Sequence, residues 1–230
     1  ALLGCKLQQL EFGWVSEKSF RSQRELHAWA TGFPSQLFQE ICTKCPRLVN
    51  LQAPGFLQTN RGIGLVATLA NLRRLNLCCA ESLLDNEVNQ ITKNCSSLRS
   101  LNLRAIRTLS DVALLAVAQH LSGSLAHINV SCCRFSETAV RKLIHSCTGL
   151  KTLDLCYCDG VTSSLVAWLC NDRALCPDLR MLGVGGLGIC DNHMIALCSK
   201  YCETLEHLGI GAARLTDAGL KLLTGLPRLQ

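Results

Sequence analysis

A repeating pattern of leucines runs along the whole chain. The pattern is Leu-x-x-Leu-x-Leu, with another apolar residue at some of the leucine positions, and after its first copy it recurs every 24 to 29 residues. Within each copy apolar and polar residues alternate, which is typical of a short strand, and a run with helical spacing follows many of them. The first leucines of the nine copies are Leu7, Leu48, Leu72, Leu98, Leu125, Leu150, Leu179, Leu205 and Leu229.

The copies predict the elements of a repeating unit. We expect eight complete strands, at residues 9–12, 50–53, 74–77, 100–103, 127–130, 152–155, 181–184 and 207–210. A serine or threonine followed by an acid precedes several apolar runs, and this pair suits a helix N-cap and the positive end of the helix dipole. The pairs Ser110-Asp111, Ser136-Glu137 and Thr216-Asp217 predict helices over residues 112–120, 138–145 and 218–223.

A unit of this size cannot bury its own apolar face, so neighbouring units must stack. Strand, turn and helix in about 26 residues predict a leucine-rich-repeat solenoid, an α/β horseshoe with a parallel β-sheet on its concave face and helices on its convex face. We expect one domain over residues 1–230, with about nine repeats of which the first and last are incomplete. The longer first interval predicts an insertion at about residues 14–44, and we expect the chain to be part of a longer protein.

Cysteines accompany the leucines in several copies. The segments CSSLRSLNL at 95–103 and CTGLKTLDLCYC at 147–158, and LTDAGL at 215–220, resemble the cysteine-containing leucine-rich repeats of F-box proteins. In that family the array captures a substrate or partner, while a separate F-box docks on a ubiquitin-ligase scaffold. The resemblance therefore implies a protein-recognition module, and it suggests a ubiquitin-ligase adaptor bound through a region that this sequence does not contain. The same repeat subclass also occurs in proteins without an F-box.

Seven of the sixteen cysteines have a structural explanation. A buried cysteine acts as a small hydrophobic residue, and seven occupy repeated core positions: Cys45, Cys95, Cys133, Cys147, Cys158, Cys176 and Cys202. Cys132, Cys133, Cys156 and Cys158 fall at nearly equivalent places in neighbouring units, so a metal cluster is an alternative there. We predict no metal and no other cofactor. The irregular cysteine spacing favours reduced thiols and an intracellular location, in the cytoplasm or the nucleus.

Composition and motifs exclude several classes of function. Lys and Arg number 23 against 17 for Asp and Glu, and this net charge of +6 is too small by itself to indicate a nucleic-acid partner. No run approaches the roughly 18 apolar residues of a membrane helix, so we expect no membrane partner. The sequence contains no phosphate-binding loop, nucleophile elbow or zinc-protease motif. We therefore predict that the protein is not an enzyme.

The register identifies candidate partner-binding residues. On the concave face these are Arg74, Asn76, Arg104, His127, Asp154 and His207. Just at strand entry, basic residues predominate: Arg47, Arg73, Arg99, Lys151, Arg180 and Arg228. From this row we select Arg73, Arg99 and Lys151 as the residues that meet an acidic or phosphorylated segment of a protein partner. The alternative is that they are solvated edge residues.

The two ends of the array raise further alternatives. Outward positions become glycine toward the C-terminus, which either admits a close partner or relieves crowding. The insertion contains Trp14 and Trp29, which either cover the array or anchor a partner, and we expect Trp29 to be the more buried.

These observations leave two readings of function. The leading one is a non-catalytic recognition module that resembles the substrate-binding part of an F-box-type ubiquitin ligase receptor. The alternative is a structural subunit of a large cytoskeletal or ribonucleoprotein assembly.

Overall fold

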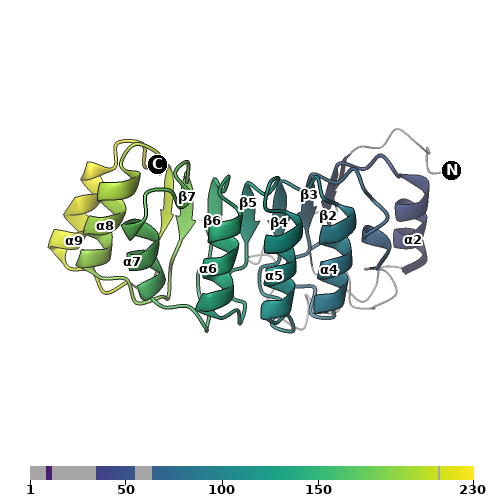
Figure 1. The fold of residues 1–230 in the computed structure, drawn as a ribbon, viewed down its shortest axis with the longest axis horizontal. Coiled ribbons are helices and arrows are strands. Elements are labelled where there is room, and N and C mark those ends of the chain that lie inside the picture. The colour runs from purple at the N-terminus through teal and green to yellow at the C-terminus, as the bar shows by residue number, and fades with distance from the viewer. Residues whose placement is uncertain (1–8, 12–34, 55–63, 212) are drawn as a thin grey trace, which may run out of the picture.

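The computed structural model describes residues 9–11, 35–54, 64–211 and 213–230. Within them the chain forms an elongated stack of strand and helix units, in which the helices lie side by side along one face of a sheet (Figure 1). The sheet has eight strands in sequential order, and every neighbouring pair is parallel. This is the predicted solenoid architecture.

The strands are β1 (Gln9–Glu11), β2 (Asn50–Gln52), β3 (Arg74–Asn76), β4 (Ser100–Asn102), β5 (His127–Asn129), β6 (Thr152–Asp154), β7 (Met181–Gly183) and β8 (His207–Gly209). Their central apolar residues align across the whole sheet, as in the pairing of Leu101 with Ile128. Strands β2 to β8 are each one residue shorter than predicted. The fourth residue still donates to the next strand, as Leu77 N–H does to the Asn102 carbonyl at 2.9 Å, but the chain turns there.

The helices are α2 (Ser35–Lys44), α4 (Asp85–Asn94), α5 (Asp111–His120), α6 (Glu137–Ser146), α7 (Ser164–Asn171), α8 (Asp191–Tyr201) and α9 (Asp217–Lys221), the last followed by a 3₁₀ turn (Leu222–Gly225). The predicted helices at 112–120, 138–145 and 218–223 thus begin one residue earlier, on the acid itself. α2 occupies the last part of the expected insertion, whereas residues 12–34 lie outside the described residues.

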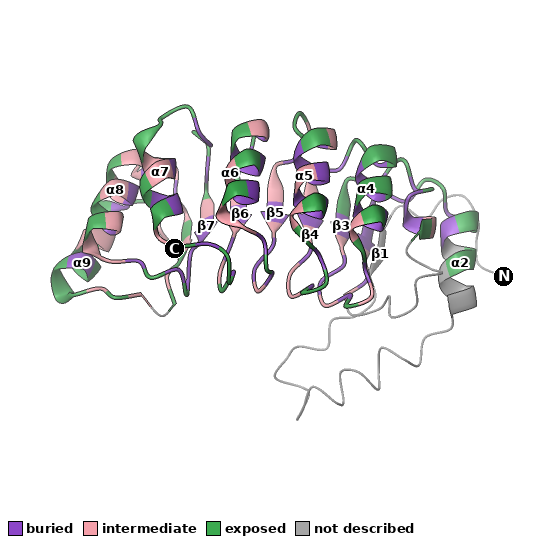
Figure 2. Cartoon of the chain, turned by 60° about the horizontal axis from the view of Figure 1, so that its bottom comes forward, coloured by how far each residue is buried: buried purple, intermediate pink, exposed green. Residues whose placement is uncertain are grey.

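Leucine side chains fill the space between the sheet and the helices. The inward residues of β2 to β7 are almost completely buried, whereas Leu208 of β8 is half-buried, and the largest fully buried side chains are Tyr201 and Phe135. Figure 2 shows this buried layer between the strands and the inner sides of the helices. Six of the seven cysteines assigned to the core are buried. Cys202 is half-buried, in one of the last units of the stack.

The acid at the start of a helix also holds the next unit in place. Asp85, Asp111, Glu137 and Asp191 each accept hydrogen bonds from both the backbone N–H and the hydroxyl of a residue about 25 positions later, namely Ser110, Ser136, Thr162 and Thr216. We call these four pairs the carboxylate ladder. Ser110 and Ser136 also cap the helices that follow them. Ser110 Oγ accepts a hydrogen bond from Val112 N–H, and Ser136 Oγ accepts one from Ala139 N–H.

Helix α7 departs from this scheme at both ends. Its first turn contains no acid, so the next helix has no carboxylate to bond, and Cys190 N–H donates instead to Nδ1 of His193 within α8 at 3.2 Å. At the other end, Lys200 Nζ donates to the carbonyl oxygens of Leu169, Asp172 and Leu175 at 2.6 to 2.7 Å. A lysine of α8 therefore satisfies the carbonyl groups at and beyond the end of α7, which the helix itself leaves free.

Polar side chains join helices α6 and α7, above the apolar core that the two units share. Helices α4, α5 and α6 pack closely in succession, as do α7, α8 and α9, but α6 and α7 do not approach each other to the same extent. Arg141 of α6 lies 4.9 Å from the ring centre of Trp168 on α7, and Glu137 accepts a hydrogen bond from Ser164. In the described part of the chain, every helix is too short or too polar to cross a bilayer.

Candidate protein-binding surface

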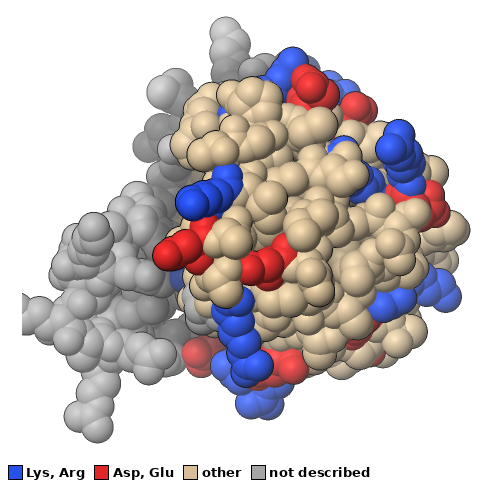
Figure 3. Space-filling model, turned by 90° about the vertical axis from the view of Figure 1, so that its left-hand side faces the viewer, with Lys and Arg blue, Asp and Glu red and all other residues tan. Residues whose placement is uncertain are grey.

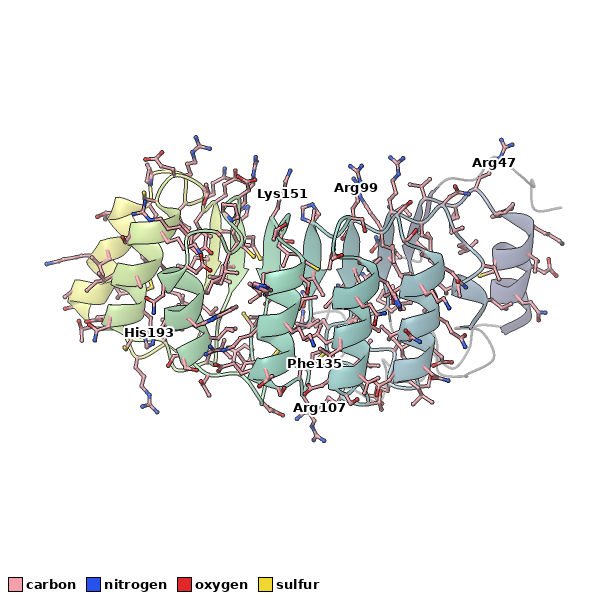
Figure 4. The ribbon with its side chains drawn as sticks, in the orientation of Figure 1. Arg47, Arg99, Arg107, Phe135, Lys151 and His193 are labelled. Atoms are coloured by element: carbon pink, nitrogen blue, oxygen red, sulfur yellow. The ribbon has the colours of Figure 1, made fainter. Side chains whose placement is uncertain are left out.

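The predicted basic row lies along the edge of the sheet where the strands begin. Four of its members, Arg73, Arg99, Lys151 and Arg180, hold equivalent positions in their units, and backbone hydrogen bonds follow that register, such as Arg99 N–H to the Arg73 carbonyl at 2.8 Å and Arg180 N–H to the Lys151 carbonyl at 2.8 Å. All six are exposed, and Figure 4 shows Arg47, Arg99 and Lys151 projecting from one edge of the stack. The same hydrogen-bond pattern places Val49, Ala126, Glu206 and Gln230 at the corresponding positions of the other units. Arg47 and Arg228 therefore lie two residues before this register, contrary to the sequence prediction, which counted them in the row.

The row is not uniform in charge along its length. Arg180 Nη1 lies 3.2 Å from Glu206 Oε1, so the positive charge of Arg180 is neutralised. Among the described residues, no carboxylate lies within 4.0 Å of the basic groups of Arg47, Arg73, Arg99 or Lys151. Unpaired positive charge is therefore concentrated on the N-terminal and middle units.

The end of the molecule beyond β8 looks different. Figure 3 views the stack from this end, where the surface consists mostly of residues other than Lys, Arg, Asp and Glu, with the charged side chains scattered or near the rim. The basic row therefore does not continue as a charged patch over this end of the molecule.

On the concave face, a row of asparagine and aspartate side chains accepts hydrogen bonds from the backbone. Oδ1 of Asn76, Asn102, Asn129 and Asp154 each accepts the N–H of the residue two positions later, at 2.9 to 3.1 Å. Asn129 Nδ2 also donates to Asp154 Oδ2 at 3.0 Å. Two of the predicted binding residues, Asn76 and Asp154, are thus half-buried and already shape the turns that follow their strands.

The other predicted concave residues fall into separate groups. His127 Nδ1 lies 3.1 Å from Thr152 Oγ1, and burial, followed by the positive charges of Lys151 and Arg74, lowers the pKa of His127 below its usual 6.5. Arg74, His127 and Lys151 therefore share one region, which the neutral histidine links to the basic row. Arg104 is half-buried, and His207 is exposed on β8, three strands from β5.

The glycine-rich end of the concave face is partly covered. Gly183 and Gly185 are buried, contrary to the outward exposure expected from the register. A Cβ added at Gly183 would lie within 3 Å of Asp154 Oδ1 and Cys156 Sγ, so these two side chains occupy the space that glycine leaves. Tyr157 similarly fills the space above Gly186, which has a φ of +78°. Relief of crowding explains these positions, whereas Gly209 and Gly211 remain exposed.

The fifteen described cysteines are free thiols. Cys133 Sγ donates to the Leu103 carbonyl at 3.2 Å and Cys158 Sγ to the Val130 carbonyl at 3.1 Å. Burial raises the pKa of Cys133 to about 11 and that of Cys158 to about 12. Within the described ranges, no three histidine, cysteine or acidic side chains converge as a metal site would require. The proposed anchors Trp14 and Trp29 lie outside the described residues.

The sequence interpretation missed the serines beside the basic row. Ser96, Ser97 and Ser124, with Gly123 and Ala126, line an open hollow of about 330 Å³ between Arg73 and Arg99. The available signal was the position of two of these serines inside the segment Cys95 to Arg99, immediately before a row residue.

Comparison with known proteins identifies the architecture. No family model matches the sequence. One similar structure is a chain in a yeast complex of Rad7 and Elc1, with a TM-score of 0.60 and 18% identity over 90% of this chain. Another is the internalin InlF of Listeria monocytogenes, with a TM-score of 0.54 and 18% identity over 80%. The matches span 56% and 54% of those two chains. Together with the repeat and the parallel sheet, they show that this chain has the leucine-rich-repeat fold.

Proposed function

We propose that residues 1–230 form a non-catalytic recognition domain that binds an acidic segment of a protein partner through its concave face and basic row. The observation that carries this proposal is the line of unpaired cations at Arg73, Arg99 and Lys151 along the strand-start edge, with the exposed Arg47 two residues before that register. Like charges that are held close together without counter-ions repel one another, so an acidic partner relieves this repulsion.

The position of the row also suits recognition. Helix C-termini point toward the strand-start edge, and the negative end of a helix dipole stabilises nearby cations. That effect accounts for single basic residues at this edge. It does not account for the difference between the neutralised Arg180 and the unpaired arginines of the earlier units.

We further propose that the partner is a substrate delivered to a ubiquitin ligase, with the adaptor bound through a region outside this sequence. The resemblance of the repeats to those of F-box proteins supports this role. The similar yeast chain belongs to a complex of Rad7 and Elc1, which supports a function in an assembly with another protein. The free thiols support a reducing location, in the cytoplasm or the nucleus.

Charge reversal tests the recognition role. The variant Arg73→Glu, Arg99→Glu, Lys151→Glu should lose its partner in affinity capture from cell extract at low salt, and raising the salt should weaken capture by the unmodified chain. The matched control is Arg134→Glu, Lys142→Glu, Lys221→Glu, which makes the same change in charge at exposed residues away from the row. We expect the control to retain the partner.

Two outcomes would contradict this proposal. Equal recovery with both triple variants at low salt would remove the basic row from recognition. A partner held in fixed stoichiometry and unaffected by salt would instead favour the structural-subunit role.

A further inference from the structure

The hollow beside Arg73 and Arg99 combines features that the rest of the basic row lacks. Its volume is about 330 Å³, and its lining is almost entirely polar or small, with Ser96, Ser97 and Ser124 as hydroxyl donors. The two arginines come from adjacent units whose backbones are joined by the Arg99 N–H bond to the Arg73 carbonyl. Two guanidinium groups and several hydroxyls therefore surround one small space.

One of these hydroxyls lacks a hydrogen-bond partner among the described residues. Ser124 Oγ is buried and has no hydrogen-bond partner among the described residues. A buried hydroxyl without a partner is unfavourable, and such groups in folded proteins often serve a ligand or an ordered water. Because Ser124 lines the hollow, an oxygen-rich group bound there would accept a hydrogen bond from this hydroxyl.

Another unit provides an internal comparison. Thr204 Oγ1 is the second buried hydroxyl without a partner in the described part of the chain, and Thr204 occupies the same repeat position as Ser124, one residue before the first leucine of its copy. There, however, the neighbouring arginine Arg180 is paired with Glu206. An anion at that unit would meet a neutralised arginine and a nearby carboxylate, whereas at Ser124 it would meet two unpaired arginines.

The chemistry favours a phosphate monoester over other anions. Guanidinium groups bind phosphate through paired N–H donors, and a phosphate carries about −1.5 to −2 charges and three acceptor oxygens at neutral pH. Two arginines and three hydroxyls match that number of acceptors better than they match a carboxylate. A nucleic-acid backbone would instead favour an unbroken line of cations, but Ala126 interrupts the row at this hollow.

We propose that the hollow between Arg73 and Arg99 binds a phosphorylated serine or threonine side chain, with Ser96, Ser97 and Ser124 as additional donors. This inference rests on the proposed function only in taking the phosphate from a protein partner. Recognition of the partner then depends on its phosphorylation state.

The first test measures binding directly. The ¹⁵N-labelled chain is titrated with N-acetyl-phosphoserine N-methylamide, and separately with the same compound without phosphate. We expect saturable amide shifts centred on Ser96, Ser97, Arg99 and Ser124 with the phosphorylated compound only. Arg73→Gln with Arg99→Gln should weaken binding about 10-fold or more, and Ser124→Ala by a smaller factor.

Arg180→Gln is the matched control and should leave binding unchanged, because Arg180 already has a carboxylate partner. Amide spectra of all variants should keep the dispersion of the folded chain. The proposal is overturned if the shifts do not saturate, or if they persist unchanged in Arg73→Gln, Arg99→Gln.

A titration with a 12-nucleotide oligothymidine tests the other source of phosphate. Tighter binding of the oligonucleotide, with equal dependence on Arg47 and Lys151, would assign the edge to nucleic acid and overturn the inference. Phosphatase treatment of the extract separates the two proposals. Capture that survives phosphatase but is lost on charge reversal would sustain the recognition role and exclude the phosphate site.

Discussion

Asp111 at the start of one helix binds both the backbone and the side chain of Ser136 at the start of the next: Ser136 N–H lies 2.8 Å from Oδ1 and Ser136 Oγ 2.6 Å from Oδ2. One carboxylate thus fixes the position of two helices. Hydrogen bonds to a charged acceptor contribute more than neutral ones, so Asp111→Ala should lower the free energy of unfolding by about 1–3 kcal/mol. Urea denaturation measures this change. The exposed Asp178→Ala serves as control and should change stability by less than about 0.5 kcal/mol.

Glu137 should make stability depend on pH in the acid range. Burial disfavours the ionised form, but hydrogen bonds from Ser164, Arg141 and Thr162 outweigh it and lower the pKa of Glu137 from 4.5 to about 2. A carboxyl with a lowered pKa stabilises the folded state fully above its unfolded pKa, and the stabilisation is lost as the pH falls from about 4.5 to about 2. Glu137→Gln should therefore reduce stability at pH 7 and have little effect near pH 2. A difference between variant and parent that stays constant over this range would contradict the assignment.

Leu101 and Asn102 are adjacent on β4 and should respond very differently to truncation. Leu101 is 2% exposed, so Leu101→Ala removes core packing shared by neighbouring units and should lower the free energy of unfolding by about 2–5 kcal/mol. Asn102 is half-buried, and its Oδ1 accepts one backbone N–H at 2.9 Å. Asn102→Ala should therefore cost about 1 kcal/mol. Thermal and chemical denaturation of the two variants provide the comparison, and equal losses would show that the register is misassigned.

Gly183→Ala tests how the glycine-rich end is built. The new Cβ would collide with the side chains of Asp154 and Cys156. Asp154 would have to move and lose the hydrogen bond that it accepts from the N–H of Cys156. We expect a loss of about 1–3 kcal/mol in unfolding free energy and shifted amide resonances at β6. Gly225→Ala is the control, because a Cβ at that position would meet no atom within 4 Å. Full stability in Gly183→Ala would show that the glycine is dispensable.

Periodicity made the fold predictable because each inward residue, such as Leu101 or Ile128, recurs at a fixed interval and can point only to the shared core. The hydrogen bonds between Asp111 and Ser136 of the next helix were not predictable in the same way. The helix-dipole interpretation assigns the acid to its own helix. Its true partner depends on how far one helix start lies from the next. The burial of Gly183 was missed for a related reason: a glycine reveals the room that it leaves, but not which neighbouring side chain fills it.

The polar junction between α6 and α7 has a mechanical consequence. Apolar packing resists shear over its whole area, whereas the contacts of Glu137 with Ser164 and of Arg141 with Trp168 act at two points and weaken with acid or added electrolyte. The sheet and the apolar core run on across this junction, so we expect any bending of the stack to open the helix layer there while the strands stay paired. Because Arg99 and Lys151 lie on opposite sides of this junction, with Ala126 between them in the row, flexing there would change the spacing of the cations that a partner meets.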